Sequence, residues 1–405
     1  MSGFTEMKTK KFAFFGCWNE VHYPSENPQE NDAPCFQIQE NEPKHKCDEF
    51  TSVLQEINEQ NVDFLVVAGD NYYPIKKKDK TTGKKDKKFE LQDFNKGFDA
   101  LESIKKPTHL LLGNHDMENI DNCEIIKQEK QRTNLLFFDY ENKNAMFRMI
   151  EDHTLLIMLD TNVFDPTEDF SCYSVFNEKN NVRESLIEKQ KTNILAYLST
   201  INTNKIRNVC FFGHHPLLSW KIKKEKVKLE DDMMELHAFL LDILTKKNLQ
   251  KKTIYYFCAH LHQYQKGTVI ISQKEHKITV HQYISGTGGA HLDPEIPREY
   301  IKKESKSVEY IDNIKSSYKM QESIKKNGFL TINTIKSYLL LVEFHTVEPS
   351  ISNSTIKSVS KTRKSKTKSK IPSRYSSLLK TLHISQSLGG GKTRRIKRKS
   401  KKNKH

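Results

Sequence analysis

Seven short apolar runs, each closed abruptly by glycine or a polar residue, constrain most strongly how this chain can fold. Each run contains hydrophobic residues, many of them β-branched or aromatic, before the closing Gly, Asp, Asn or His. Such runs are typical of buried strands with polar residues at their ends. They are KFAFFG, VDFLVVAGDNYY, THLLLGNHD, HTLLIMLDTN, NVCFFGHHP, TIYYFCAHLH and HQYISGTGG.

Three amphipathic stretches lie between these runs, namely DEFTSVLQEINEQN, LIEKQKTNILAYLSTI and ELHAFLLDILTKKN. Their apolar residues recur at helical spacing and share one face. Alternation of strands and helices predicts a layered α/β domain. After Tyr338, LLLVEFHTV predicts a last strand that pairs with GFLTINTI across a short turn.

The positive charge of the chain is concentrated near its C-terminal end. The formal net charge is +15, yet residues 357–405 hold 18 Lys and Arg and no acidic residue. The remainder is nearly balanced, with 48 basic and 51 acidic residues. We therefore expect a folded domain over 1–348, with its core at about 10–346, and a disordered basic tail over 349–405. That tail could bind nucleic acid or acidic surfaces, act as a nuclear-localisation signal, or simply keep the protein in solution.

Two polar segments are expected to be insertions in the domain. Residues 20–47 carry four prolines and predict a long loop. Residues 76–88 are lysine-rich and follow a predicted strand end. They predict either a solvated loop or an electropositive lip that attracts phosphorylated substrates.

Cysteine content and hydropathy bear on the compartment. Seven cysteines, an odd number without dense regular spacing, argue against a disulfide framework. No secretory signal is recognised, and no apolar run approaches the ~20 residues that a membrane span needs. The prediction is a soluble protein of a reducing intracellular compartment, the cytoplasm, or the nucleus if the basic tail directs it there.

Polar clusters follow five of the predicted strands. Any one of them has a structural explanation, because Gly-Asp caps turns and His-x-His in a strand can be merely exposed. Five together, at strand ends that can converge on one point, predict a metal site. Asp, Asn, Tyr and His ligands suit Fe, Mn and Zn. The clusters are Cys17 and Asn19; Asp70, Asn71 and Tyr73; Asn114, His115 and Asp116; His214 and His215; and His260 and His262.

The ordered series GDNYY, GNHD, GHHP and AHLH resembles the metallophosphoesterase, or calcineurin-like phosphoesterase, family. Three details resemble its purple, or tartrate-resistant, acid phosphatase branch: a Gly-Asp-Asn-x-Tyr element at 69–73, SGTGGA at 285–290, and the helical EKQKTNILAYL. The likeness spans about residues 10–346. It implies a four-layer α/β/β/α sandwich of two mixed sheets flanked by helices.

The resemblance also implies two metal ions, Fe with Zn, Fe or Mn, bridged by Asp70. The second ion would take Asn114, His214 and His260. The first would take Tyr73, His262 and the aspartate of a GDWG element, which reads GCWN here with Cys17 in its place. Thiolate and phenolate ligands favour Fe or Zn over Mg.

The implied reaction is hydrolysis of phosphomonoesters by a metal-bound hydroxide, with a phosphorylated small molecule or phosphoprotein as substrate. Asp70 and His115 would be catalytic, the latter contacting the phosphate and assisting the leaving group. Surrounding polar residues would orient ligands or meet substrate; they are Asn19, Asn71, Asp116 and His215. Two alternatives are a nucleotide or nucleic-acid phosphodiesterase of the same family, and a weakened scaffold whose basic tail binds polyanions.

Cys17 allows three interpretations. It can ligate as a thiolate, which Zn accepts readily. It can leave the first site one ligand short, with Asn19 or water filling the gap. It can also mark a site that has lost its first metal. Cysteine at the end of an apolar strand is often just a small buried hydrophobe, but the family alignment directs this one toward the cluster.

Overall fold

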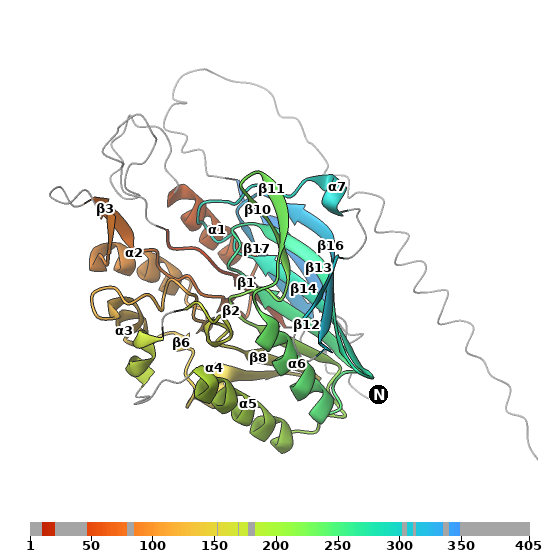
Figure 1. The fold of residues 1–405 in the computed structure, drawn as a ribbon. Coiled ribbons are helices and arrows are strands. Elements are labelled where there is room, and N and C mark those ends of the chain that lie inside the picture. The colour runs from red at the N-terminus through yellow and green to blue at the C-terminus, as the bar shows by residue number, and fades with distance from the viewer. Residues whose placement is uncertain are drawn as a thin grey trace, which may run out of the picture. The chain divides into compact units, whose positions relative to one another are not determined.

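Two mixed sheets packed face to face form the centre of the protein in the computed structural model (Figure 1). The structure describes residues 10–20, 47–78, 85–151, 153–168, 170–176, 183–301, 306–310, 313–334 and 340–348. The expected loop at 20–47 falls almost entirely outside these ranges, and the expected tail at 349–405 does so completely.

The first sheet has six strands, of which the central ones are parallel. In order across the sheet they are β18 (Leu340–Thr346), β17 (Gly328–Thr334), β1 (Lys11–Phe15), β2 (Phe64–Val67), β5 (Thr108–Leu110) and β6 (Leu136–Phe137). The predicted pairing of the last two strands is confirmed, since β17 and β18 are antiparallel neighbours.

The second sheet has eight strands and again a parallel centre, formed by β8, β9, β12 and β14. Its order is β15 (Lys306–Glu309), β16 (Lys315–Ile324), β13 (Tyr264–Gln273), β14 (His276–Ser285), β12 (Thr253–Cys258), β9 (Asn208–Phe212), β8 (Thr154–Met158) and β7 (Phe147–Ile150). The carboxyl ends of parallel neighbours lie at one edge of a sheet, which is where the predicted site residues follow their strands.

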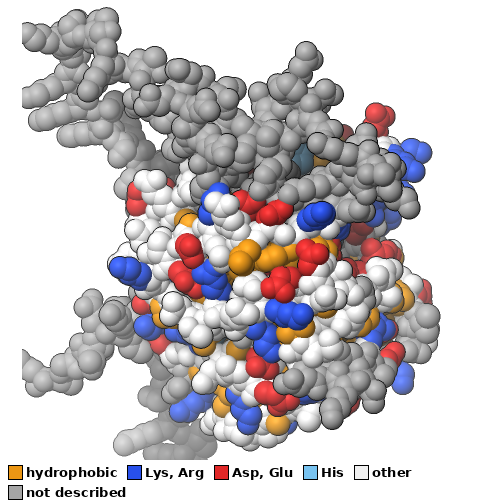
Figure 2. All heavy atoms as spheres, turned by 90° about the vertical axis from the view of Figure 1, so that its left-hand side faces the viewer, with side chains coloured by type: hydrophobic (Ala, Val, Ile, Leu, Met, Phe, Trp, Pro, Cys, Tyr) orange, Lys and Arg blue, Asp and Glu red, His pale blue; other side chains and the backbone are white. Residues whose placement is uncertain are grey.

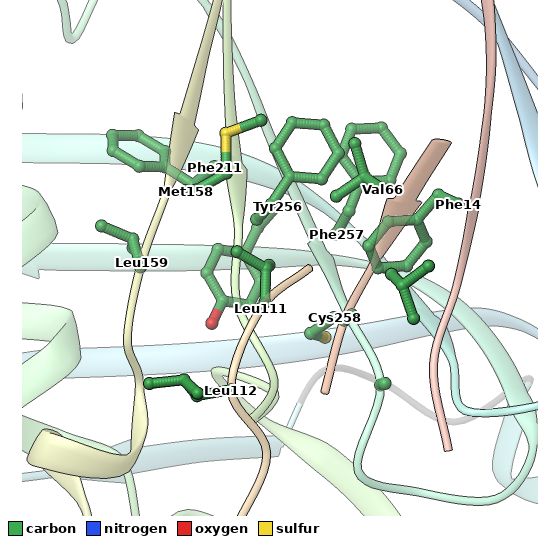
Figure 3. Close-up of a cluster of buried hydrophobic side chains, with 14 of the residues drawn as sticks. Phe14, Val66, Leu111, Leu112, Met158, Leu159, Phe211, Tyr256, Phe257 and Cys258 are labelled. Carbon is green, nitrogen blue, oxygen red and sulfur yellow. The ribbon is translucent and has the colours of Figure 1, made fainter. Parts of the chain in front are cut away.

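Aromatic and aliphatic side chains from both sheets meet in one core (Figure 3). The ring of Phe14 on β1 lies 5.7 Å from that of Phe257 on β12, and Phe12 lies 6.0 Å from Phe212 on β9. All residues of β2, β8 and β9 are buried. Strands covered on both faces need continuous apolar sequence, which explains why these runs show no alternation.

Helices cover the outer faces of the sheets (Figure 1). The α1 and α2 helices flank the six-stranded sheet, and α5 and α6 flank the eight-stranded one. Three of the four match the predicted amphipathic stretches. The helices are α1 (Cys47–Glu59), α2 (Leu91–Glu102), α3 (Glu124–Lys130), α4 (Lys143–Met146), α5 (Arg183–Thr200), α6 (Met234–Lys246) and α7 (Arg298–Ile301), with 3-10 turns η1 (Asn162–Phe164) and η2 (Ser171–Phe176). The predicted four-layer architecture is confirmed.

The lysine-rich segment differs from the predicted loop. Strands β3 (Ile75–Lys78) and β4 (Lys85–Lys88) pair antiparallel in a hairpin whose tip, 79–84, lies outside the described residues. Strands pair through backbone hydrogen bonds, which do not require alternating hydrophobic residues. The lysine-rich sequence therefore carried no hydrophobic pattern from which these strands could be predicted. A second hairpin is formed by β10 (Ser219–Lys223) and β11 (Lys226–Glu230).

Among the described residues, a disulfide that the cysteine spacing did not predict joins Cys123 at the start of α3 to Cys172 in η2. The reducing intracellular compartment stays a prediction, although bonds of this kind persist mainly where conditions are oxidising. Three other cysteines, Cys17, Cys210 and Cys258, are buried with free thiols. Within the described ranges, no helix has the length and apolarity to cross a membrane.

Charged side chains on one face of the described surface are mixed in sign. On the face shown in Figure 2, Lys and Arg alternate with Asp and Glu instead of forming a basic patch. This agrees with the near balance of charge outside residues 357–405.

Candidate metal centre

Five strand ends meet at one point between the two sheets. Loops after β1, β2 and β5 bring residues from the first sheet, and loops after β9 and β12 bring residues from the second. The backbone is left-handed at Cys17 (φ 54°), Asp70 (φ 50°) and His260 (φ 61°). Such conformations cost roughly 1–3 kcal/mol each and cluster at functional sites. The tight turns they make aim all three side chains into the junction.

One group of ligand atoms surrounds His214. Its Nε2 lies 3.1 Å from Asn114 Oδ1, 3.3 Å from Asp70 Oδ1 and 3.3 Å from His260 Nδ1. The Nδ1 of His214 donates to the Ala68 carbonyl at 2.7 Å, so Nε2 is the ring nitrogen that faces these atoms. A carboxylate oxygen, an amide oxygen and imidazole nitrogens that converge in this way form a ligand set that fits a metal ion.

A second group surrounds Tyr73. Its hydroxyl lies 2.9 Å from Asp70 Oδ2 and 2.9 Å from His262 Nε2. His262 Nδ1 donates to the His291 carbonyl at 2.6 Å, so Nε2 presents a lone pair as well. One phenolic proton cannot satisfy both acceptors, and Cys17 Sγ approaches the same Asp70 oxygen at 3.7 Å. This group, too, fits a metal ion, and Asp70 belongs to both groups.

Burial and charge set the protonation of the centre. Burial raises the pKa of the Cys17 thiol well above its ordinary value, and Asp70 raises it further. Burial and Asp70 likewise raise the pKa of Tyr73. Burial also opposes ionisation of Asp70, but His214 and His115 outweigh it and hold the pKa of Asp70 well below its usual range. A bound cation is therefore what would ionise the thiol and the phenol.

Asp116 links the strand ends by hydrogen bonds. Its carboxylate accepts from the backbone N–H groups of Asn71 and Gly113, both at 2.7 Å, and from Asn71 Nδ2 at 3.0 Å. Asn71 in turn accepts from Trp18 Nε1 at 3.0 Å. The ends of β1, β2 and β5 are thus linked by hydrogen bonds through two buried side chains.

His115 lies beside the shared aspartate. Its backbone N–H donates to Asp70 Oδ1 at 3.1 Å, and its ring Nδ1 contacts Glu118 Oε1 at 2.5 Å. Burial lowers the pKa of His115, but Asp70 and Glu118 outweigh it and raise that pKa to about 9. Glu118 also pairs with Lys87 of the lysine-rich hairpin at 2.5 Å. Sequence reasoning missed Glu118, although a carboxylate three residues after the histidine was a usable signal.

One side chain that was not predicted from the sequence, that of Thr161, holds the backbone of both His214 and His215 by hydrogen bonds. Thr161 follows β8, and its hydroxyl oxygen accepts from the backbone N–H groups of both histidines at 3.0 Å. The ring of His215 lies 4.7 Å from that of His260, so it borders the centre. The LDTN at the end of one predicted strand carried the signal for Thr161.

The side chain of Asn19 packs toward α2. A Cβ on Gly97 of α2 would lie 2.4 Å from the carboxamide atoms of Asn19. The backbone carbonyl of Asn19 accepts from the Tyr73 backbone N–H at 3.2 Å. Among the described residues, no hydrogen bond connects its carboxamide to the ligand groups. Asn19 thus lies next to the centre without reaching it.

The glycine-rich segment after β14 closes over Cys17. The Ser285 carbonyl accepts from Gly16 N–H at 3.0 Å, and Ala290 N–H donates to the Cys17 carbonyl at 3.1 Å. A Cβ on Gly286 would meet Cys17 Sγ at 3.1 Å and the Leu261 carbonyl at 2.1 Å. Only glycine fits at position 286, because any side chain would collide with these atoms. This is the physical reason for glycine in the SGTGGA motif.

A family model for calcineurin-like phosphoesterases matches residues 10–264, more than half of the 405-residue chain. The chain belongs to the calcineurin-like phosphoesterase family. This confirms the family predicted from the strand-end motifs. The members of this family are metal-dependent phosphoesterases, which agrees with the two groups of candidate ligands.

Two solved structures are similar to this calcineurin-like phosphoesterase at low identity. One is described as GAP50, the anchor in the inner membrane complex of Plasmodium, at 13% identity and a TM-score of 0.43, covering 85% of this chain and 90% of that one. The other is PhoD, at 11% identity and a TM-score of 0.46, covering 80% of this chain and 63% of that one. No curated protein matches the chain.

Proposed function

We propose that this phosphoesterase is a binuclear metal-dependent phosphomonoesterase of the purple acid phosphatase type. The observation that carries the proposal is the convergence of two groups of acceptor atoms on the one carboxylate of Asp70. We assign Fe with Zn, Fe or Mn to the pair of sites. One ion would be held by Asp70, Asn114, His214 and His260, and the other by Asp70, Tyr73, His262 and Cys17.

Bound metal ions would neutralise phosphate oxygens and lower the pKa of a water molecule, which supplies the nucleophile. The remaining chemistry belongs to side chains of the chain itself. His115 is proposed to donate a proton from Nε2 to the departing alcohol oxygen, because Glu118 occupies its Nδ1 at 2.5 Å and fixes the ring. Asn71 and Asp116 keep the loops that carry Asp70 and Asn114 in position.

The proposed substrate is a phosphorylated small molecule or phosphoprotein. Support for monoesters comes from Tyr73 in the Gly-Asp-Asn-x-Tyr element, which resembles the acid phosphatase branch. Lys87 of the lysine-rich hairpin pairs with Glu118 beside His115, which supports that hairpin as an electropositive lip of the site.

Hydrolysis of a chromogenic aryl phosphate, measured together with the metal content of the purified protein, tests the proposal. We expect turnover that chelation abolishes and that Fe, Zn or Mn restores. Absence of turnover with each of these metals supplied would exclude the proposed activity. Faster cleavage of an aryl phosphodiester than of the monoester would instead favour the nucleotide or nucleic-acid phosphodiesterase alternative.

A further inference from the structure

A small pocket of about 50 Å³ adjoins the metal centre. Two of its lining residues, His215 and His260, border the centre, and the other eight comprise three carboxylates, one lysine and four uncharged residues. Its charged lining residues are Asp165, Lys221, Glu230 and Asp232. The hairpin β10–β11 contributes Lys221 and Glu230, and Asp165 follows η1. The pocket therefore lies where the alcohol part of a bound phosphate ester can extend.

The imidazole of His215 presents an unused donor at this pocket. Thr161 Oγ1 already accepts two backbone N–H groups at 3.0 Å, so its own proton goes to His215 Nδ1 at 3.1 Å. Nε2 then carries the hydrogen. This Nε2 has no hydrogen-bond partner among the described residues, and the side chain is only 2% exposed. A buried N–H without an acceptor is costly, which points to an acceptor on a ligand.

Three carboxylates line the pocket against the one ammonium of Lys221, and Glu230 is also paired with Lys223 at 2.6 Å. Ligand atoms of Asp165, Glu168 and His215 all lie within 4.8 Å of one another. Burial and the neighbouring Asp165 raise the pKa of Glu168 to about 7. Burial, Glu230 and Asp231 raise the pKa of Asp232 as well. Crowded carboxylates of this kind favour a cationic ligand.

Lys221 supplies the one ammonium among the lining residues. His215 and His260 form the part of the wall that borders the metal centre, and the carboxylates of Asp165, Glu230 and Asp232 belong to the rest of it. A metal ion does not fit this arrangement, because His215 Nε2 offers a hydrogen and no lone pair.

We propose that the pocket binds an aliphatic ammonium group on the alcohol part of the substrate, while His215 Nε2 donates to a phosphoryl oxygen. The substrate class would be amino-alcohol phosphates. This inference rests on the phosphomonoesterase activity proposed above. The small volume suits a primary ammonium better than a quaternary one.

Steady-state hydrolysis of ethanolamine phosphate and of 2-hydroxyethyl phosphate, which replaces the ammonium by a hydroxyl, tests the proposal. We expect kcat/KM to favour the amine by roughly tenfold or more, the size of one charge-assisted hydrogen bond. Asp165→Asn and Asp232→Asn should each reduce that preference several-fold. Asp99→Asn, on the remote α2 helix in an exposed pair with Arg132, should leave the preference unchanged.

The outcomes separate the two proposals. Equal hydrolysis of both phosphates by the wild type, or a preference that survives both pocket substitutions, would overturn the ammonium site and leave the phosphomonoesterase standing. No hydrolysis of either compound or of the aryl phosphate would overturn both.

Discussion

Cys17 sits in a backbone conformation that aspartate adopts more readily than cysteine. Its φ of 54° lies in the left-handed region, where Asp and Asn are several-fold enriched over other non-glycine residues. The thiol nevertheless faces Asp70 at 3.7 Å and is fully buried. We propose that a bound metal ion, and not core packing alone, keeps this side chain in its strained position beside the shared carboxylate.

Replacing Cys17 by Asp should therefore change which metal the first site prefers. An oxygen ligand is harder than a thiolate, so Cys17→Asp should retain more Mn and less Zn than the wild type when both are offered together. Metal analysis after dialysis measures this. Cys258→Ala, at another buried free cysteine, is the control. Identical metal content in wild type and Cys17→Asp would show that position 17 holds no ion.

His115 should matter most for substrates with poor leaving groups. If it donates the proton, His115→Asn should lower kcat by roughly 10²–10⁴ for an alkyl phosphate and far less for a nitrophenyl phosphate, whose anion needs no proton. Glu118→Gln keeps a hydrogen-bonding partner for the ring and should cost less. Equal losses on both substrates would assign His115 to binding instead.

At the scale of elements, a disulfide anchors the loop that carries His115. Cys123 ends the segment that follows β5, and Cys172 lies in η2, 49 residues further along the chain. Closing a loop of this length restricts the unfolded chain by on the order of 4 kcal/mol in the chain-entropy model.

Cys172→Ser should thus lower the free energy of unfolding by about 2–5 kcal/mol. Urea titrations without and with a reductant measure the effect. The wild type should lose the same amount when reduced, and the variant should respond to the reductant much less than the wild type does. A wild type that is equally stable in both conditions would contradict a structural role for this bond.

On the scale of the whole molecule, buried neutral histidines couple stability to pH. His237 on α6 bonds Ser316 and the Leu217 carbonyl, and burial lowers its pKa to about 4 from an ordinary value near 6.5. The unfolded chain therefore binds this proton more tightly than the folded one. The loss of folding stability caused by His237 is absent above about pH 6.5. It grows as the pH falls toward 4 and reaches on the order of 3 kcal/mol.

His237→Gln should flatten this loss of stability between pH 6.5 and 4. Urea titrations at several pH values measure the slope, with His276→Gln in the exposed β13–β14 turn as the matched control. A slope unchanged in His237→Gln would assign the acid sensitivity to other groups.

The basic segment and the domain should act separately. We propose that residues 357–405, which hold 18 Lys and Arg, bind polyanions by releasing counterions. Deleting them should abolish salt-sensitive binding to a nucleic acid in a mobility-shift assay while hydrolysis of the aryl phosphate persists. Collapse of hydrolysis in the truncated chain would show that the separation is wrong.

Much of this protein could be predicted from sequence because its signals are local. Uninterrupted apolar runs mark strands buried on both faces, and Asp70, Asn114, His214 and His260 stand directly after such runs. What sequence could not supply were contacts between distant segments: the partner of Cys123, the support of two histidine backbones by Thr161, and the acidic pocket beside His215.

The amino-acid sequence by itself determined the layered architecture, the family and the order of the ligand-bearing strand ends, since each depends on patterns of a few neighbouring residues. Only the tertiary structure decided that Asp70 is shared by two groups of acceptors, that Asn19 packs toward α2, and that Lys87 reaches Glu118. The reason is physical: periodicity reports which face of an element is buried, whereas a site depends on which loops of two different sheets end at the same point.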